Sequence, residues 1–506
     1  GPKELMNMQR FYLYLNMTKP GEKLILSYSD TNAKGEGISP AYLIGSIRSL
    51  YPKLEIEGGA GVRPHKNSIN NYCYPENPEA GIDLFLEKLV QETEKEHEDI
   101  LEQADETDAM FGELYSWYLR NPEYRSRVQK LVQSAFAGKP EDIISQSVAK
   151  ALYGEVSPYS ATRLERFAAC AFAHFLQYGM KLTERVEYEF KPMDMGNVMH
   201  EALESFAEEV RKRGMKWTEL TEQERNEIAD RCLDNIVADY GNTVLKSSAR
   251  NEYMIERTRR ILRRTVWALQ KQLEQGEFQP EGFEVTFGGG RIDRVDIMED
   301  QNKVYVKVID YKTGNTSFDL VYLYHGLQLQ LMIYLDGALR VEQKKYPDKE
   351  IIPAGVFYYN IKDPMIQEKI DADVEAVSAG LMKELKMNGL VQADPELVYR
   401  MDSSLGSIPV AFNKDGSFRK NSSVADRTQF AVLGRYVRTK IEKIRSSILE
   451  GDAEVSPYEL GKKNACTYCP YMTVCGFDRR LSGYEFRRLK NFSDEELWKA
   501  FDREAE

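Results

Sequence analysis

Two short charged stretches on either side of a polar turn constrain the fold of this chain more than any other feature. The first is Gly-Arg-Ile-Asp-Arg-Val-Asp at residues 290–296, and the second is Val-Ile-Asp-Tyr-Lys-Thr-Gly at residues 308–314. Before the second stretch, valine recurs at every second position from 304 to 308, which is the period of a strand with one buried face. We therefore predict a β-hairpin with strands at 291–298 and 303–310, joined by a four-residue turn.

This hairpin would bring two carboxylates and a lysine to one face. With a four-residue turn, Asp293 faces Val308 on the returning strand. Asp310 and Lys312 point to the same side as Val308, so Asp293 and Asp310 become diagonal neighbours, roughly 7–8 Å apart at the backbone. A register shift of one residue would separate them, and the geometry therefore depends on the turn.

Two carboxylates and a lysine on one strand face suit metal-assisted hydrolysis of a phosphodiester. Hard oxygen ligands select Mg²⁺ or Mn²⁺. The cation polarises the scissile phosphate and activates water, and Lys312 can orient that water or stabilise charge at phosphorus. The alternative is a surface hairpin with solvated charges. The second aspartate, at a matching position of the paired strand, favours the metal site.

Together with two further motifs, the hairpin resembles the RecB-family nuclease domain of the PD-(D/E)xK superfamily. These motifs are Gly-Asn-Val-Met-His-Glu at 196–201 and Leu-Gln-Leu-Gln-Leu-Met-Ile-Tyr at 327–334. The likeness runs from about Tyr159 to Gly476 and is closer still to the C-terminal half of the B subunit of AddAB-type helicase–nucleases. It implies an α/β fold, in which a mixed sheet flanked by helices forms a restriction-endonuclease-like core after helical and helicase-like segments.

The resemblance also assigns roles to single residues. His200 would be a metal ligand beside Asp293 and Asp310, and the main-chain carbonyl of Tyr311 would reach the same metal. A neutral imidazole can complete a site made by two carboxylates.

A glutamine on the helix after the hairpin belongs to the same motif set. By resemblance, Gln330 would lie near the scissile phosphate or the attacking water, and Gln328 is the alternative. Tyr334 is four residues after Gln330 and shares its helix face. A helix that simply covers the sheet remains the other interpretation of Tyr334.

Four of the six cysteines form one constellation, a single cysteine followed by a Cys-x2-Cys-x5-Cys trio: Cys170, Cys466, Cys469 and Cys475. Four thiolates suit zinc or an iron–sulfur cluster, and the spacing alone does not separate the two. The resemblance implies a 4Fe-4S cluster that ties the two ends of the nuclease domain together. Free buried cysteines are the alternative, and we interpret Cys73 and Cys232 in that way.

The chain has 506 residues, too many for one core, so we predict several segments. They are a remnant of a helicase-like domain at 1–65, a linker and helical scaffold at 66–157, the nuclease domain at 158–480 and a charged tail at 481–506. No apolar stretch is long enough for a transmembrane helix, and no secretory signal opens the chain. Because cysteines without a signal favour a reducing compartment, we expect a cytoplasmic protein without membrane contact. Gly1-Pro2 resembles a protease scar, which suggests a fragment of a longer protein.

The residue pattern of the N-terminal segment predicts a helix at 8–15 and a strand at 24–28. The intervening Met-Thr pair resembles the last motif of superfamily 1 helicases, but Lys19 stands where those proteins have arginine and lacks its planar fork. No Gly-x4-Gly-Lys-Ser/Thr loop occurs in the sequence, so we do not expect this chain to hydrolyse ATP.

The formal net charge of −12 argues against general affinity for nucleic acid but allows a local basic track. The candidates are Arg257, Arg259, Arg260, Arg263 and Arg264, and then Arg479, Arg480, Arg487, Arg488 and Lys490. The first cluster has helical spacing, so a solvated helix face is the alternative.

These observations predict a Mg²⁺-dependent exonuclease acting on single-stranded DNA. By resemblance it would degrade the 5′-ended strand, as a heterodimer with the A subunit of a helicase–nuclease that processes double-strand breaks for recombination. One alternative is a stand-alone CRISPR-associated-type exonuclease, against which the helicase-like segment argues. The other is a non-catalytic DNA-binding or assembly module, against which the complete set of site residues argues.

Overall fold

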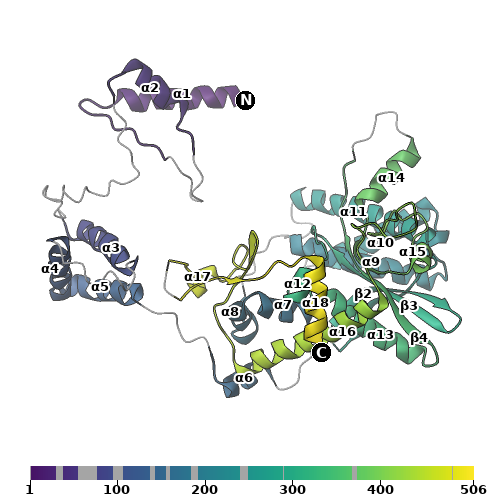
Figure 1. The fold of residues 1–506 in the computed structure, drawn as a ribbon. Coiled ribbons are helices and arrows are strands. Elements are labelled where there is room, and N and C mark those ends of the chain that lie inside the picture. The colour runs from purple at the N-terminus through teal and green to yellow at the C-terminus, as the bar shows by residue number, and fades with distance from the viewer. Residues whose placement is uncertain are drawn as a thin grey trace. The chain divides into compact units, whose positions relative to one another are not determined.

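Contacts divide the chain into two units, Gly1–Ala135 and Phe136–Glu506, in the computed structural model shown in Figure 1. The structure describes residues 2–29, 38–54, 77–94, 106–136, 143–154, 160–183, 192–239, 249–288, 290–366, 373–480 and 483–505. Across these residues, no helix combines the length and the apolar character that a membrane span requires.

The first unit is helical in its described part. Its helices are α1 (Pro2–Thr18), α2 (Tyr42–Leu50), α3 (Pro78–Glu94), α4 (Glu106–Arg120) and α5 (Pro122–Ala135). Helices α3 to α5 share a small core that includes Phe85, Tyr118 and Val128. Cys73, in the predicted linker, lies outside the described residues.

The prediction for the first residues is only half right. The helix expected at 8–15 is longer and becomes α1, but the strand expected at 24–28 does not form. Leu24 and Ile25 are 44% and 76% exposed, and no described strand pairs with this stretch. A strand needs such a neighbour to satisfy its backbone, so β-forming side chains alone do not produce one.

The second unit is built on a six-stranded sheet whose spatial order follows the chain. The strands are β1 (Gln279–Phe287), β2 (Gly290–Asp300), β3 (Lys303–Lys312), β4 (Glu350–Asn360), β5 (Asn388–Gln392) and β6 (Val424–Ala425). The pairs β3–β4 and β5–β6 are parallel, and the other neighbours are antiparallel. The sheet is therefore mixed, and helices flank it, which confirms the predicted α/β fold.

The hairpin of β2 and β3 has a tighter turn than predicted. The turn occupies only residues 301–302, and the register therefore differs from the expected one by two residues. Arg294 pairs with Ile309, and the same register continued by one residue places Asp293 opposite Asp310. A shift of two residues keeps every side chain on its face, so the two carboxylates still share a face but are direct rather than diagonal neighbours.

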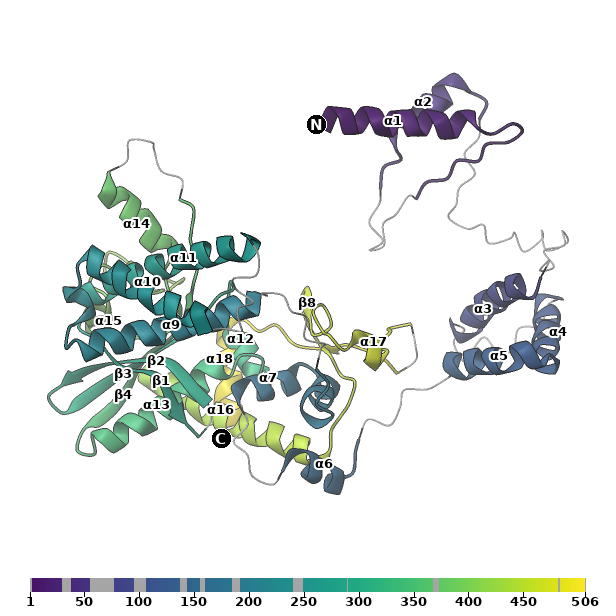
Figure 2. The same cartoon turned by 180° about the vertical axis from the view of Figure 1, so that it is seen from behind.

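Helices cover both faces of the sheet, as Figure 2 shows for α9 to α11 on one side and α13 on the other. The first layer contains α9 (Pro192–Lys212), α10 (Glu222–Asp239), α11 (Ala249–Glu274) and α15 (Pro395–Met401), and α14 (Val374–Glu384) follows β4. The second layer contains α6 (Gln146–Tyr153), α7 (Ala161–Ala169), α12 (Leu320–Tyr324), α13 (Gln330–Lys345) and α16 (Arg427–Glu450). Along β3, Val306 and Val308 face this second layer, whereas Tyr305 and Ile309 face the first.

The last part of the chain returns to the start of the second unit. It contains the small sheet β8-β7-β9, with β7 (Tyr458–Leu460), β8 (Lys463–Asn464) and β9 (Arg487–Arg488), and the short helix α17 (Met472–Cys475). Helix α7 leads into α8 (Ala171–His174) and a π-helical turn at Phe175–Gly179. The segment predicted as a charged tail contains helix α18 (Asp494–Ala505), in which Leu497 and Phe501 are buried in the second layer.

A buried ion group stabilises the strand that carries Asp293. The guanidinium of Arg294 donates to both carboxylate oxygens of Asp296, at 2.6 and 3.0 Å, and Nζ of Lys307 lies 3.0 Å from the same carboxylate. Arg294 also lies over the rings of Trp217 and Phe283. All three charges are buried, so each depends on the others for its compensation.

Candidate active site

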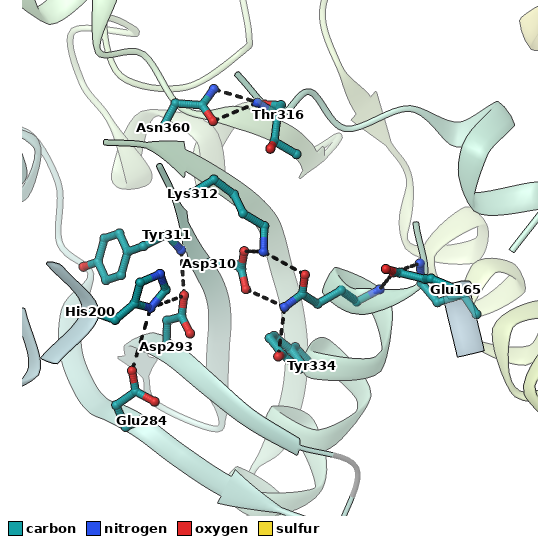
Figure 3. A network of polar contacts seen from close by, with 12 residues as sticks. Glu165, His200, Glu284, Asp293, Asp310, Tyr311, Lys312, Thr316, Tyr334 and Asn360 are labelled. Atoms are coloured by element: carbon teal, nitrogen blue, oxygen red, sulfur yellow. Dashed lines mark hydrogen bonds and ion pairs between the residues drawn. The ribbon is translucent and has the colours of Figure 1, made fainter. Parts of the chain in front are cut away.

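Three carboxylates occupy matching positions on three adjacent strands. In the β1–β2 ladder Phe283 pairs with Arg294 and Val285 with Ile292, which places Glu284 opposite Asp293. The β2–β3 register places Asp310 on the other side of Asp293, and Figure 3 shows the three side chains together. Directly opposed residues have Cβ atoms roughly 4.5–5.5 Å apart, so the three charges are close neighbours.

His200 completes a set of candidate metal ligands with two of these carboxylates. Its Nδ1 lies 3.4 Å from Oδ2 of Asp293 and 4.0 Å from Oε1 of Glu284. One ligand atom from each of the three residues lies within 4.8 Å of the other two. The amide nitrogen of Tyr311 donates to Oδ2 of Asp293 at 2.7 Å and fixes that carboxylate. An imidazole and two carboxylates at this spacing can hold a divalent cation.

The first turns of α9 place His200 at the end of the strands. Val198, Met199 and Ala202 are buried in the core of the first layer, which leaves His200 at the edge of the apolar face. Gly196 lies beside Thr313, just beyond β3, where a Cβ atom would be 3.4 Å from Oγ1 of Thr313, an ordinary van der Waals contact.

The charges of the site shift the pKa values of its members. Burial and the neighbouring Asp293 raise the pKa of Glu284 to about 7. Burial and Asp293 also raise the pKa of Asp310 to about 7, against the opposing charge of Lys312. Burial is the largest single effect on His200 and opposes its protonation, but the hydrogen bond to Asp293 and the charges of Asp293, Asp310 and Glu284 together outweigh burial and raise the pKa of His200. The excess of negative charge in the site thus favours the protonated forms of these side chains, and a divalent cation could compensate the same excess.

Lys312 and Gln330 form a closed set of contacts with Asp310. Nζ of Lys312 lies 2.5 Å from Oδ2 of Asp310 and donates to Oε1 of Gln330 at 2.8 Å. Nε2 of Gln330 donates to Oδ1 of Asp310 and to the hydroxyl oxygen of Tyr334, both at 2.9 Å. The carboxylate of Asp310 therefore turns toward Lys312 and Gln330, whereas that of Asp293 turns toward His200.

Of the two candidate glutamines, only Gln330 reaches this group. Gln328 accepts from the amide of Asp319 at 3.0 Å and donates to the carbonyl of Ser317 at 2.9 Å. It therefore holds the loop between β3 and α12.

Two carboxylates near the site were not among the predicted residues. Glu284 lies on the strand before the predicted hairpin, and adding that strand to the ladder would have found it. Glu165 on α7 accepts hydrogen bonds from the amides of Leu329 and Gln330. No local pattern could have found Glu165, because 164 residues separate it from its nearest partner.

The four predicted cysteines also come together. Cys170 follows α7, Cys466 and Cys469 follow β8, and Cys475 ends α17. Burial and the neighbouring thiols of Cys170, Cys469 and Cys475 raise the pKa of Cys466 to about 12. Nη2 of Arg166 lies 4.0 Å from Sγ of Cys469, which places a positive charge beside the thiols. Cys232 is buried elsewhere, in the core of the first layer.

The candidate basic tracks are largely neutralised by acidic neighbours. On α11, Arg259 pairs with Asp234, Arg260 with Asp363 and Arg263 with Asp230. Near the C-terminus, the pairs are Arg480–Asp478, Arg488–Glu459 and Lys490–Glu496. This pairing favours the alternative interpretation, a solvated helix face, for the first cluster.

The sheet, the carboxylates and the lysine together define a nuclease fold of the PD-(D/E)XK class. The sequence profile of the PD-(D/E)XK nuclease superfamily matches residues 158–476, and the chain belongs to that superfamily. Over 523 residues it is 39% identical to the B subunit of the ATP-dependent helicase/deoxyribonuclease of Lachnoclostridium phytofermentans, covering 99% of this chain and 43% of that protein. It is 32% identical over 525 residues to the protein of the same name from Alkaliphilus metalliredigens, covering 98% and 44%. The predicted resemblance is confirmed, and the chain spans less than half the length of these relatives.

Proposed function

We propose that this chain is the nuclease part of a helicase–nuclease and that it cleaves single-stranded DNA, degrading the 5′-ended strand. The observation that carries the proposal is the row Glu284, Asp293 and Asp310 on adjacent strands, with His200 on one side and Lys312 on the other. Many carboxylates at one point need a cation, and a lysine beside them suits a phosphate substrate.

The residues present fit Mg²⁺ or Mn²⁺, because their donor atoms are carboxylate oxygens and one imidazole nitrogen. Such a cation, when bound, polarises the phosphate and activates water. His200, Asp293 and Asp310, with the main-chain carbonyl of Tyr311, would hold it.

The remaining side chains of the site act on the phosphate and on each other. Lys312 would offset the charge that develops at phosphorus, and Gln330 holds the Lys312 ammonium in place. Tyr334 in turn accepts from Gln330 and fixes the orientation of its amide.

Digestion of end-labelled single-stranded DNA in Mg²⁺, in Mn²⁺ and in EDTA tests this function. We expect the parent to cut only with a divalent cation, and Asp310→Ala to be at least about 10³-fold slower. Asp300→Asn is the matched control, because Asp300 lies at the far end of β2 and pairs with Arg400. Labels at the 5′ and 3′ ends report the polarity. Equal cutting by parent and Asp310→Ala would refute the site, and no cutting even with the helicase partner subunit would favour an assembly module.

We also propose that the four cysteines hold a 4Fe-4S cluster. The thiols of Cys170, Cys469 and Cys475 neighbour that of Cys466, although Cys170 comes from a distant segment of the chain. Four thiolates suit zinc or an iron–sulfur cluster, and the resemblance favours the cluster. Arg166 beside Cys469 would compensate thiolate charge.

Metal analysis and visible absorption of the purified chain test the cluster. We expect iron and sulfide in the parent, their loss in Cys469→Ser, and no change in Cys232→Ser, the buried-thiol control. Zinc in place of iron, or equal iron in both variants, would overturn the proposal.

The wider setting is likewise proposed from the relatives named above. The intact protein would form a heterodimer with a helicase–nuclease A subunit in the cytoplasm and process double-strand breaks for recombination. Residues 1–65 would be the remnant of a helicase-like domain, and residues 158–480 the nuclease domain.

A further inference from the structure

Helix α7 contacts both the cysteine site and the nuclease site. Its last turn leads into Cys170, and Arg166 reaches toward Cys469. One residue earlier, Glu165, which Figure 3 labels, accepts a hydrogen bond from the amide of Gln330 at the start of α13. The side chain of Gln330 contacts Asp310 in the nuclease site. Packing of Leu164 and Phe167 into the core of the second layer holds α7 in place.

The carboxylate of Glu165 binds the start of α13. Its Oε1 accepts from the amide of Leu329 at 2.7 Å and from the amide of Gln330 at 2.9 Å. The N-cap residue of this 16-residue helix, Leu329, offers no side-chain acceptor of its own. Helix N-termini leave amides unsatisfied and attract negative charge, so Glu165 supplies from another helix what the local sequence lacks.

The same turn of α13 carries the side chain that contacts both Lys312 and Asp310 in the nuclease site. From its position beside Glu165, Gln330 accepts from Lys312 and donates to Asp310. Both contacts are short, at 2.8 and 2.9 Å, and hydrogen bonds weaken steeply as the distance grows. A shift of the backbone of Gln330 by about 1 Å would therefore break them.

We propose that Glu165 is a positioning residue of the nuclease site: by holding the main chain of Leu329 and Gln330, it fixes the Gln330 amide against Lys312 and Asp310. The inference rests on the proposed nuclease function and extends it to a residue outside the ligand set. Glu165 acts through Gln330 and touches neither phosphate nor cation.

A double-mutant cycle separates positioning from simple support of the fold. The four proteins are the parent chain, Glu165→Ala, Gln330→Ala and the double variant, assayed for kcat and KM on single-stranded DNA in Mg²⁺. We expect Glu165→Ala, which removes the acceptor of both amides, to lower kcat about 10- to 100-fold with KM within about twofold. If Glu165 acts through Gln330, the double variant is no slower than Gln330→Ala alone, because the residues form one unit.

Asp394→Ala is the matched control. Asp394 also accepts two amides at a helix N-terminus, those of Glu396 and Leu397 at the start of α15. Its loss should lower thermal stability and leave kcat within about twofold of the parent. If the losses of kcat in Glu165→Ala and Gln330→Ala multiply in the double variant, or if Asp394→Ala loses as much kcat as Glu165→Ala, the proposal is overturned.

A second readout covers the case in which the isolated chain cuts too slowly to measure. Gln330 also orients Asp310, so calorimetric Mn²⁺ titration of the same four proteins gives an independent cycle. We expect weaker Mn²⁺ binding in Glu165→Ala and no further weakening in the Gln330→Ala background, whereas unchanged affinity in Glu165→Ala contradicts the inference. The proposed function fails separately, when Asp310→Ala cuts and binds Mn²⁺ like the parent.

Discussion

Gln330 accepts a hydrogen bond from Nζ of Lys312 at 2.8 Å and, through the other end of the same amide, donates one to Asp310 at 2.9 Å. An amide has one accepting and one donating end, so only one of its two orientations satisfies both partners. The same nitrogen also donates to the hydroxyl of Tyr334, which can accept or donate and therefore fits either orientation. Gln330 thus holds the ammonium of Lys312 and the carboxylate of Asp310, which lie 2.5 Å apart, in defined positions.

Loss of that amide should slow catalysis more than it weakens substrate binding. We expect Gln330→Ala to lower kcat about 10²-fold with little change in KM, because Lys312 and Asp310 both lose the amide that holds them in place. Gln328→Ala is the matched control, since that glutamine only holds the loop after β3, and kcat should change by less than about threefold. Steady-state kinetics on a labelled oligonucleotide gives kcat and KM for both variants. Similar losses of kcat in the two would show that Gln330 has no special role.

Glu284 should contribute to cation binding although the sequence motifs omit it. We expect Glu284→Gln to weaken Mn²⁺ binding about 10-fold, because the variant removes one of three converging negative charges. The measurement is calorimetric titration, with Glu281→Gln on the same strand as control because Glu281 pairs with Lys345 away from the site. Unchanged affinity in Glu284→Gln would remove this residue from the ligand set.

The buried ion group beside the site should be sensitive to the loss of its one negative member. Asp296→Asn leaves Arg294 and Lys307 as uncompensated buried charges, and we expect a loss of about 3–5 kcal/mol in the free energy of unfolding. Urea unfolding followed by circular dichroism gives the value. In Asp300→Asn, at an exposed end of the same strand, the loss should stay below about 1 kcal/mol, and a similar result for Asp296→Asn would mean that the group relaxes or admits water.

His174 should make the protein labile to acid. It is fully buried, Nε of Arg163 donates to its Nε2, and burial together with Arg163 lowers its pKa to about 3. The unfolded state binds a proton near pH 6.5 and the folded state does not. The contribution of neutral His174 to the free energy of unfolding is therefore complete above pH 6.5 and is lost as the pH falls toward 3.

Comparison of parent and His174→Gln at two pH values tests this. Between pH 6.5 and 4.5 we expect the parent to lose about 2 kcal/mol more than the variant, because the slope reaches about 1.4 kcal/mol per pH unit only below pH 6.5. Chemical denaturation at each pH supplies the difference, and parallel curves for the two proteins would contradict a neutral His174.

The sequence predicted the faces of the hairpin better than its turn. The alternation of valines along β3 predicts which residues share a face of the sheet, and in the structure the same residues share a face. The turn was too long in the prediction because residues 299 and 300 are polar. Glu299 nevertheless stays in the strand, where it pairs with Val304 in the ladder and bonds Lys349.

Other parts of the site depend on contacts between distant segments. The four cysteines were predictable as a group because thiolate ligands have a characteristic identity and spacing. Glu165 was not, since a glutamate in an amphipathic helix gives no sign of what it will meet. The strand expected at 24–28 failed for the related reason that β-structure requires a partner as well as suitable side chains.

Helix α18 packs against the segment that leads into the nuclease site, although the residues of α18 are synthesised long after those of the site. Phe501 packs against Tyr324 of α12, the helix that leads into Gln330, and Glu504 bonds the hydroxyl of Tyr324. Tyr436 closes the same cluster by donating to the carbonyl of Tyr324. A chain still on the ribosome therefore has every carboxylate of the site long before it has the helix that packs against Tyr324. The contacts of α18 with α12 can form only after residues 494–505 have left the exit tunnel.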